Sequence, residues 1–152
     1  MNVATLLLFF SLPLWGAQPQ VDFSGSWQQD ASRSVPEVKA GRSRELDIQL
    51  TATTLTYKLI TKSSQGPRTQ AFKFEIGGPE IVYTGLDGDE FHTKVRWDGE
   101  ALVFDTVEHE RGSEILSKQV WTVTDGGKSL REVRQTMKSG KPVESVAVYE
   151  KR

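Results

Sequence analysis

The 152-residue sequence contains no cysteine. This absence excludes disulfide bonds, thiolate metal sites, a cysteine nucleophile and a lipid-modified N-terminal cysteine. The fold must therefore be held together by burial of apolar side chains alone, which a chain of this length can achieve.

The sequence also lacks an excess of charge of one sign. Lysine and arginine total 19 against 20 for aspartate and glutamate, which gives a formal net charge of -1. Such a chain has no field that would attract phosphate backbones or anionic lipid. We therefore expect neither nucleic acid nor a stable membrane insertion of the mature chain.

Sequence signatures of catalysis are missing as well. The chain has no G-x-S-x-G, H-E-x-x-H or dinucleotide-binding pattern, and the Gly126–Ser129 stretch is not followed by a helix-forming segment. We predict no catalytic residue, no cofactor and no metal ligand.

The longest apolar run, residues 3–15, is too short for a membrane span of about 20 residues and contains a proline. Gly16 and Ala17 follow it, which is the layout of a secretory signal peptide. We expect residues 1–17 to be a signal peptide, residues 18–152 to be one domain, and the mature protein to be secreted or periplasmic.

Apolar and polar residues alternate along most of the remaining chain, which is typical of half-buried strands. Leu46, Ile48 and Leu50, for example, alternate with polar residues, and turns such as Asp98–Gly99 separate the runs. At most a short helical turn is expected at residues 30–34. The expected strands are residues 22–29, 43–52, 54–62, 68–76, 80–84, 90–98, 101–109, 114–124, 129–138 and 143–151.

A meander of strands with one apolar face and no covering helix buries that face by closing into a barrel. We therefore predict an all-β, up-and-down antiparallel barrel of about eight to ten strands. Barrels of this size either enclose a small ligand or are filled by their own side chains.

Four motifs occur in an order and spacing that resemble a known superfamily. An F-x-G-x-W motif lies at residues 23–27, R-W-D-G at 96–99, W-T-x-T-D-G-G-K at 121–128, and V-Y-E-K at 148–151. Together they resemble the calycin superfamily of lipocalins and fatty-acid-binding proteins, and more closely small exported bacterial lipocalin-like proteins. The resemblance implies a lipocalin-like barrel.

The same resemblance implies structural roles for five residues. Phe23, Gly25 and Trp27 would close one end of the barrel, and Arg131 or Arg134 would lie over the Trp27 indole in a cation–π contact.

Two features of the fatty-acid-binding proteins are not matched. Their last strand carries R-x-Y, whose arginine and tyrosine hold a carboxylate, whereas this chain has Ala147, Val148 and Tyr149. Their helical lid is also unmatched, because residues 27–44 are too few and include a proline. A lipocalin-like cup is therefore the better analogue.

Polar candidates for chemistry are few. His92 and His109, the only histidines, could bind a metal or haem iron, but both lie among charged residues and are interpreted as solvated surface side chains. The acidic run at residues 87–90 lacks the ligand spacing of a calcium loop and is interpreted as a turn.

Aromatic residues from successive strands give the leading hypothesis, an exported, non-catalytic carrier of a small hydrophobic molecule. The alternative is a structural or protein-interaction barrel with a filled core, whose exposed rows such as Lys94 and Arg96 contact a partner. A haem-binding barrel, or an isomerase or cyclase with His92, His109 or Glu108 pointing inward, is a further alternative. The predicted ligand-binding residues are Trp27, Phe72, Phe74, Trp97, Trp121 and Tyr149.

Overall fold

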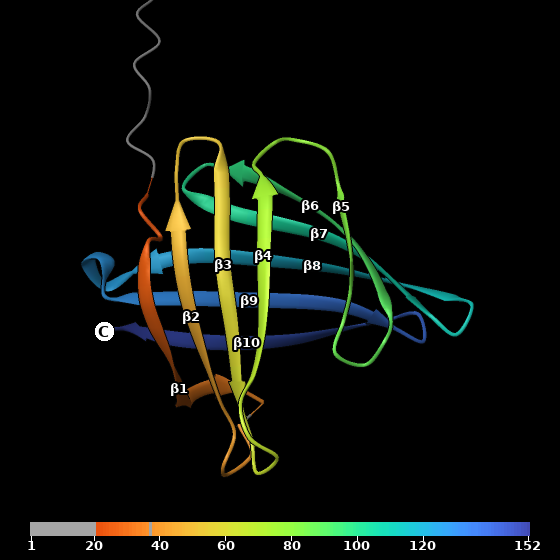
Figure 1. Cartoon of the computed structure of the whole chain (residues 1–152), viewed down its shortest axis with the longest axis horizontal. Helices are drawn as coiled ribbons and strands as arrows, with labels where there is room; N and C mark the ends of the chain where they lie inside the picture. The colour runs from red at the N-terminus through yellow and green to blue at the C-terminus, as the bar shows by residue number, and fades with distance from the viewer. Residues whose placement is uncertain (1–20, 37) are drawn as a thin grey trace, which may run out of the picture.

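A computed structural model describes residues 21–36 and 38–152. The expected signal peptide lies outside these residues. Ten strands dominate the described chain, together with one short 3-10 turn, η1 (Asp125–Gly127) (Figure 1). The strands are β1 (Gly25–Val35), β2 (Ser43–Leu50), β3 (Thr54–Lys62), β4 (Arg68–Glu75), β5 (Ile81–Thr84), β6 (Glu90–Asp98), β7 (Ala101–Glu110), β8 (Ser113–Thr124), β9 (Ser129–Lys138) and β10 (Lys141–Lys151).

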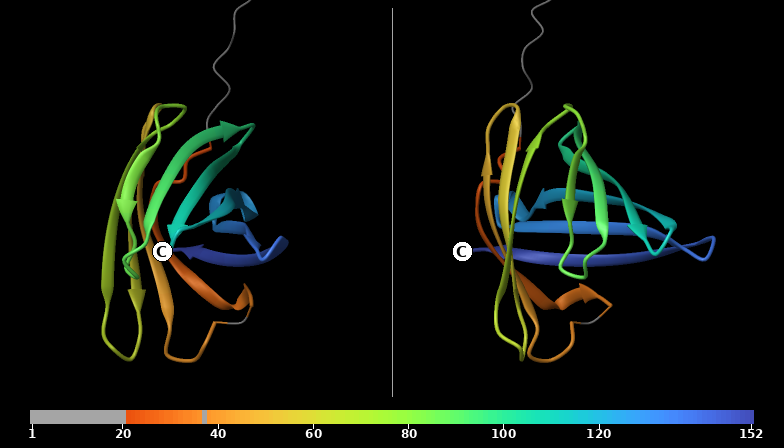
Figure 2. Two further views of the ribbon diagram at one scale, coloured as in Figure 1. Left: turned by 90° about the vertical axis from the view of Figure 1, so that its right-hand side faces the viewer. Right: turned by 45° about the vertical axis from the view of Figure 1, so that its right-hand side comes forward.

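The strands form a single antiparallel sheet in the order β4-β3-β2-β1-β10-β9-β8-β7-β6-β5. Each strand pairs with its neighbour in sequence except at β4 and β5, and β1 pairs with β10. The strands β1–β4 cross β7–β10 at a steep angle, so the sheet curls around an interior (Figures 1 and 2). The predicted all-β, up-and-down barrel is thus confirmed, and the helical lid is absent from the described part of the chain.

The barrel is nearly closed rather than sealed, because β4 and β5 are not hydrogen-bonded to each other. The connection between them instead reaches β6, where Gly77 N donates to Val95 O at 2.7 Å. Phe72 and Tyr83 pack across the opening with ring centroids 5.0 Å apart. Side chains therefore cover the gap between β4 and β5 that the backbone leaves open. The up-and-down barrel expected from the sequence would instead have hydrogen bonds between these two strands.

Residues 30–34 belong to β1 and do not form the expected helical turn. The pairing of β1 with β10 shifts register between Asp30 and Val35, which marks a bulge. Ser34 supports this irregular stretch, because its hydroxyl donates to Asp30 O at 2.7 Å and accepts from Val148 N at 3.3 Å. The serine replaces ladder bonds that the bulge removes.

One end of the barrel is closed by the F-x-G-x-W segment. Trp27 is 1% exposed, and its Nε1 donates to Phe23 O at 2.9 Å. Gly25 has a positive φ of 128°, and a Cβ there would lie 2.9 Å from Lys151 Cε. A glycine is needed at this position, since other residues rarely adopt such a φ.

The cation over the Trp27 indole is Lys151, whose Nζ lies 5.2 Å from the ring centroid. Lys151 is the direct cross-strand partner of Trp27, which places it over the ring. Arg131 is exposed, and Arg134 instead donates to Gln119 Oε1 at 2.9 Å. The cation–π role that the resemblance implied for Arg131 or Arg134 therefore belongs to Lys151.

Candidate ligand-binding cavity

The interior of the barrel contains a cavity of about 320 Å³. None of the residues of the closing F-x-G-x-W segment lines it. The cavity reaches the turn between β5 and β6, where Leu86 and Asp87 form part of its edge. Its walls come from alternate residues of the strands, because every second side chain of a strand points to the same face. The cavity has one aromatic wall and one polar wall.

Aromatic side chains of β3, β4, β7 and β8 form the first wall. Tyr57 stacks on Phe72 with ring centroids 4.8 Å apart and meets Trp121 edge-on at 5.1 Å. Phe104 packs on Trp121 at 4.7 Å and on Phe74 at 5.9 Å. Such offset and edge-to-face pairs stabilise one another and give a rigid apolar surface.

Arg44, Glu132 and Tyr149 form the centre of the polar wall. Glu132 is 8% exposed, and its Oε2 accepts from Tyr149 OH at 3.4 Å. Arg44 Nη1 lies 3.9 Å from Glu132 Oε1. Both contacts are long for charge-assisted interactions, which usually measure about 2.7–2.9 Å. The Glu132 carboxylate is therefore buried with loose partners.

The Tyr149 phenol responds to this environment. Burial raises its pKa, and the nearby Glu132 charge raises the pKa further. Burial likewise raises the pKa of Tyr57 well above its usual value. Both phenols therefore stay protonated at neutral pH and can donate a hydrogen bond.

A second hollow of about 390 Å³ opens under the connection between β1 and β2. Arg44, Thr61 and Glu132 line this hollow and also the inner cavity. The loose Arg44–Glu132 pair thus stands at the junction of the two spaces. A molecule passing from the outer hollow to the aromatic wall would meet these two charges first.

Four of the six predicted ligand-binding residues line the inner cavity: Phe72, Phe74, Trp121 and Tyr149. Trp27 and Trp97 do not line it. Trp97 packs against Phe23 at the closed end, with ring centroids 6.0 Å apart. The indole Nε1 atoms of Trp97 and Trp121 are both buried without a hydrogen-bond partner among the described residues, and of the two only Trp121 lines the cavity. Buried donors are nearly always paired, so the Trp121 N–H can take an acceptor from a ligand.

The polar wall was missed from the sequence, although a signal for it was present. Arg44 has the same two-residue phase as Leu46 and Ile48, which point inward, and Glu132 shares the phase of the buried Leu130. Charged residues in the inward phase of a strand should have been placed in the interior.

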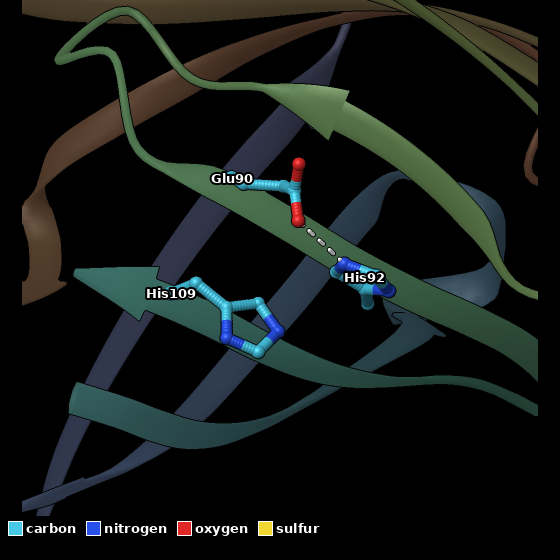
Figure 3. Close-up of side chains that lie close together, drawn as sticks. All are labelled: Glu90, His92 and His109. Atoms are coloured by element: carbon cyan, nitrogen blue, oxygen red, sulfur yellow. Dashed lines mark hydrogen bonds and ion pairs between the residues drawn. The ribbon is translucent and has the colours of Figure 1, made fainter. Parts of the chain in front are cut away.

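His92 and His109 lie side by side on the outer face of the neighbouring strands β6 and β7 (Figure 3), and neither lines the cavity. Their ring centroids are 4.9 Å apart, and one ligand atom each of His92, His109 and Glu90 lies within 4.8 Å of the others. Glu108 lies near Asp87 and Asp89. Burial and then these aspartates raise the pKa of Glu108.

No helix in the described part of the chain is long and apolar enough to cross a membrane.

Comparison with known proteins gives similarity in structure only, since no protein-family model and no curated protein matches the sequence. The "REP1-NXSQ fatty acid transporter" matches with a TM-score of 0.63 at 18% identity, covering 85% of this chain and 95% of that one. Apo lipid binding protein 8 of Caenorhabditis elegans matches with a TM-score of 0.62 at 17% identity, covering 86% and 95%. Zebrafish ileal bile acid-binding protein, complexed with cholic acid, matches with a TM-score of 0.61 at 14% identity, covering 86% and 98%. The chain therefore has the same antiparallel β-barrel fold as these structures.

Proposed function

We propose that this protein is an exported, non-catalytic carrier of a small hydrophobic molecule, which it holds in the inner cavity. The observation that carries the proposal is an aromatic-lined cavity of about 320 Å³ inside the barrel, within the range of about 300–1,000 Å³ that is typical of ligand pockets. Burial of an apolar ligand against the aromatic wall would supply the affinity.

The polar wall favours a ligand with an acidic head group. Two arginines, Arg44 and Arg134, and two carboxylates, Glu132 and Asp87, line the cavity, but Asp87 lies at its edge and Glu132 holds Arg44 only loosely. Arg44 can exchange its loose contact with Glu132 for a closer one with a ligand carboxylate. Tyr149 and Trp121 offer further hydrogen-bond donors.

The structural neighbours support this proposal. By their names, the similar structures include a fatty acid transporter, a lipid binding protein and a bile acid-binding protein. A barrel with a filled core is less consistent with a cavity of this size. An isomerase or cyclase that uses His92, His109 or Glu108 is disfavoured, because both histidines lie on the outer face and Glu108, which shares the inward phase of Phe104, does not line the cavity.

Export is part of the proposal and is supported by the sequence of residues 1–17. The apolar run followed by small residues has the layout of a signal peptide. Expression of the full-length gene product in a bacterium, followed by N-terminal sequencing of the periplasmic fraction, tests it. A mature N-terminus near Gln18 is expected, and recovery of the uncleaved chain in the cytoplasm would contradict export.

The binding proposal is tested by tryptophan fluorescence during titration with fatty acids, retinoids, bile acids and haem. Trp121 lines the cavity, so its emission should change and saturate with at least one of these classes. A flat response across the whole panel would reject the proposal.

A pair of variants on the β3–β4 hairpin locates the binding site. Thr61→Phe places a bulky ring at the junction of the two hollows and should lower the affinity about tenfold, which corresponds to about 1.4 kcal/mol. Thr69→Phe makes the same change at an exposed position of β4 and should bind as the wild type does. Equal affinities of the two variants would place the ligand outside the cavity.

A further inference from the structure

We propose that Glu90, His92 and His109 form a binding site for a divalent transition-metal ion, with Zn²⁺ as the best-fitting ion, on the outer face of the β6–β7 hairpin (Figure 3). This site is separate from the cavity and independent of the proposed ligand-binding function.

The hairpin register brings the three side chains together. Glu90 lies directly opposite His109, and His92 is two residues further along β6, so all three share the outer face. Cross-strand neighbours and their diagonal neighbours are close enough for long side chains to meet. His92 Nε2 is 2.9 Å from Glu90 Oε1, and one ligand atom from each of the three residues lies within 4.8 Å of the other two.

These separations are close to those of an occupied site. Ligand atoms bound to one Zn²⁺ at about 2.0–2.2 Å in a tetrahedral arrangement lie about 3.4 Å apart. The 2.9 Å between His92 Nε2 and Glu90 Oε1 must therefore widen by about half an ångström, and a pair at the 4.8 Å limit must close by about 1.4 Å. The His92 and His109 side chains are 25% and 38% exposed, so small rotations can provide this movement.

A further carboxylate supports His92 in such a role, because Glu80 Oε1 lies within hydrogen-bond distance of His92 Nδ1, at 3.3 Å. Glu114 Oε1 lies 3.8 Å from His109 Nδ1, which is beyond hydrogen-bond distance. The Nε2 atom of each histidine can therefore face an ion. Figure 3 shows a ring nitrogen of His92 directed toward Glu90 and one of His109 directed toward His92. A carboxylate behind each metal-binding histidine is the usual arrangement in zinc sites, where it fixes the ring orientation.

The donor set selects the class of ion. Imidazole nitrogens suit Zn²⁺, Cu²⁺ and Ni²⁺, whereas Mg²⁺ and Ca²⁺ prefer oxygen ligands only. Two histidines and one carboxylate supply three protein ligands, and a fourth position at this exposed site remains open to water. The tetrahedral preference of Zn²⁺ fits three ligands from two neighbouring strands.

Isothermal titration calorimetry of the metal-free full-length chain with zinc chloride tests the proposal. One Zn²⁺ should bind per chain, and the double variant His92→Gln/His109→Gln should lose this binding. Glu80→Gln, which alters only the support of His92, should weaken binding about tenfold. Glu100→Gln removes an exposed carboxylate at the turn of the same hairpin and should bind Zn²⁺ as the wild type does.

The substitutions lie at the surface, and circular dichroism of each variant checks that the barrel is retained. Visible absorption of the Co²⁺-loaded chain gives a second readout, because four-coordinate Co²⁺ has much stronger d–d bands than the octahedral, oxygen-ligated ion that unspecific carboxylate binding gives. The absence of saturable Zn²⁺ binding by the wild type, or equal binding by the double variant, would overturn the proposal.

Discussion

The closed end and the cavity of this barrel differ in the polar groups that they bury. At the closed end these are neutral indole N–H groups: Trp27 Nε1 has a short bond to Phe23 O at 2.9 Å, and Trp97 Nε1 has no partner among the described residues. In the cavity, Glu132 is buried with partners at 3.4 and 3.9 Å. The closed end is rigidly packed, whereas the polar groups of the cavity can exchange their partners for a ligand. The difference indicates that stability and binding are served by different ends of one barrel.

The largest effect is expected when the closed end is broken. Trp27→Ala removes a fully buried indole and should lower the free energy of unfolding by about 3–5 kcal/mol, because it loses packing and leaves a void. Urea denaturation followed by circular dichroism measures it. Trp27→Phe, which keeps a ring but loses the bond to Phe23 O, should cost clearly less. A loss below about 1 kcal/mol for Trp27→Ala would show that this end does not stabilise the barrel.

Alkaline pH should reveal the buried phenols of the cavity. The pKa of Tyr149 and the pKa of Tyr57 are raised by burial, so the folded chain keeps both protons at a pH where the unfolded chain has lost them. Their contribution to stability is therefore complete below about pH 10 and is lost as the pH rises toward the folded pKa values.

The expected slope is a fall in the free energy of unfolding of about 1.4 kcal/mol per pH unit for each such tyrosine above about pH 10. Denaturation at several pH values measures it. Tyr149→Phe should reduce this slope by about 1.4 kcal/mol per pH unit, the contribution of one tyrosine, even if the substitution also changes stability at neutral pH. An unchanged slope in this variant would show that Tyr149 ionises in the folded protein.

The loose contact between Glu132 and Arg44 should influence ligand affinity more than the free energy of unfolding. Under the proposed function, Glu132→Gln removes the charge that competes with a ligand carboxylate for Arg44. Affinity for a fatty acid should rise about tenfold, or about 1.4 kcal/mol, while affinity for the fatty alcohol of equal length stays the same. Calorimetric titration of both ligands measures the contrast. Equal changes for acid and alcohol would mean that Glu132 acts through the shape of the cavity.

Much of the fold was predictable from alternation and turns, because these depend on neighbouring residues. The strands at residues 54–62, 90–98 and 129–138 have the expected bounds. The open seam between β4 and β5 was not predictable from a local pattern, since pairing is decided by the curvature of the whole sheet. Within the site, Phe72, Phe74 and Trp121 of the aromatic wall were among the predicted residues, whereas Tyr57 and Phe104 were not. The partners of Glu132 depend on distances between strands far apart in sequence.

The histidine cluster was within reach of the sequence. A turn at Asp98–Gly99 fixes the register of the hairpin and places Glu90 opposite His109. The same register places His92 beside Glu90 and His109. The charged neighbours of each histidine in sequence, by contrast, indicate only a solvated side chain.

The smallest effect is expected at the rim of the closed end, where Lys151 covers the Trp27 indole. Lys151→Gln should lower the free energy of unfolding by about 0.5–1 kcal/mol, since the cation lies 5.2 Å from the ring and is exposed to solvent. Arg131→Gln also removes one positive charge, at an exposed position of β9, and should change stability by less than about 0.5 kcal/mol. Urea denaturation of both variants separates a contact with the indole from a general effect of charge, and equal losses would contradict the Lys151 contact.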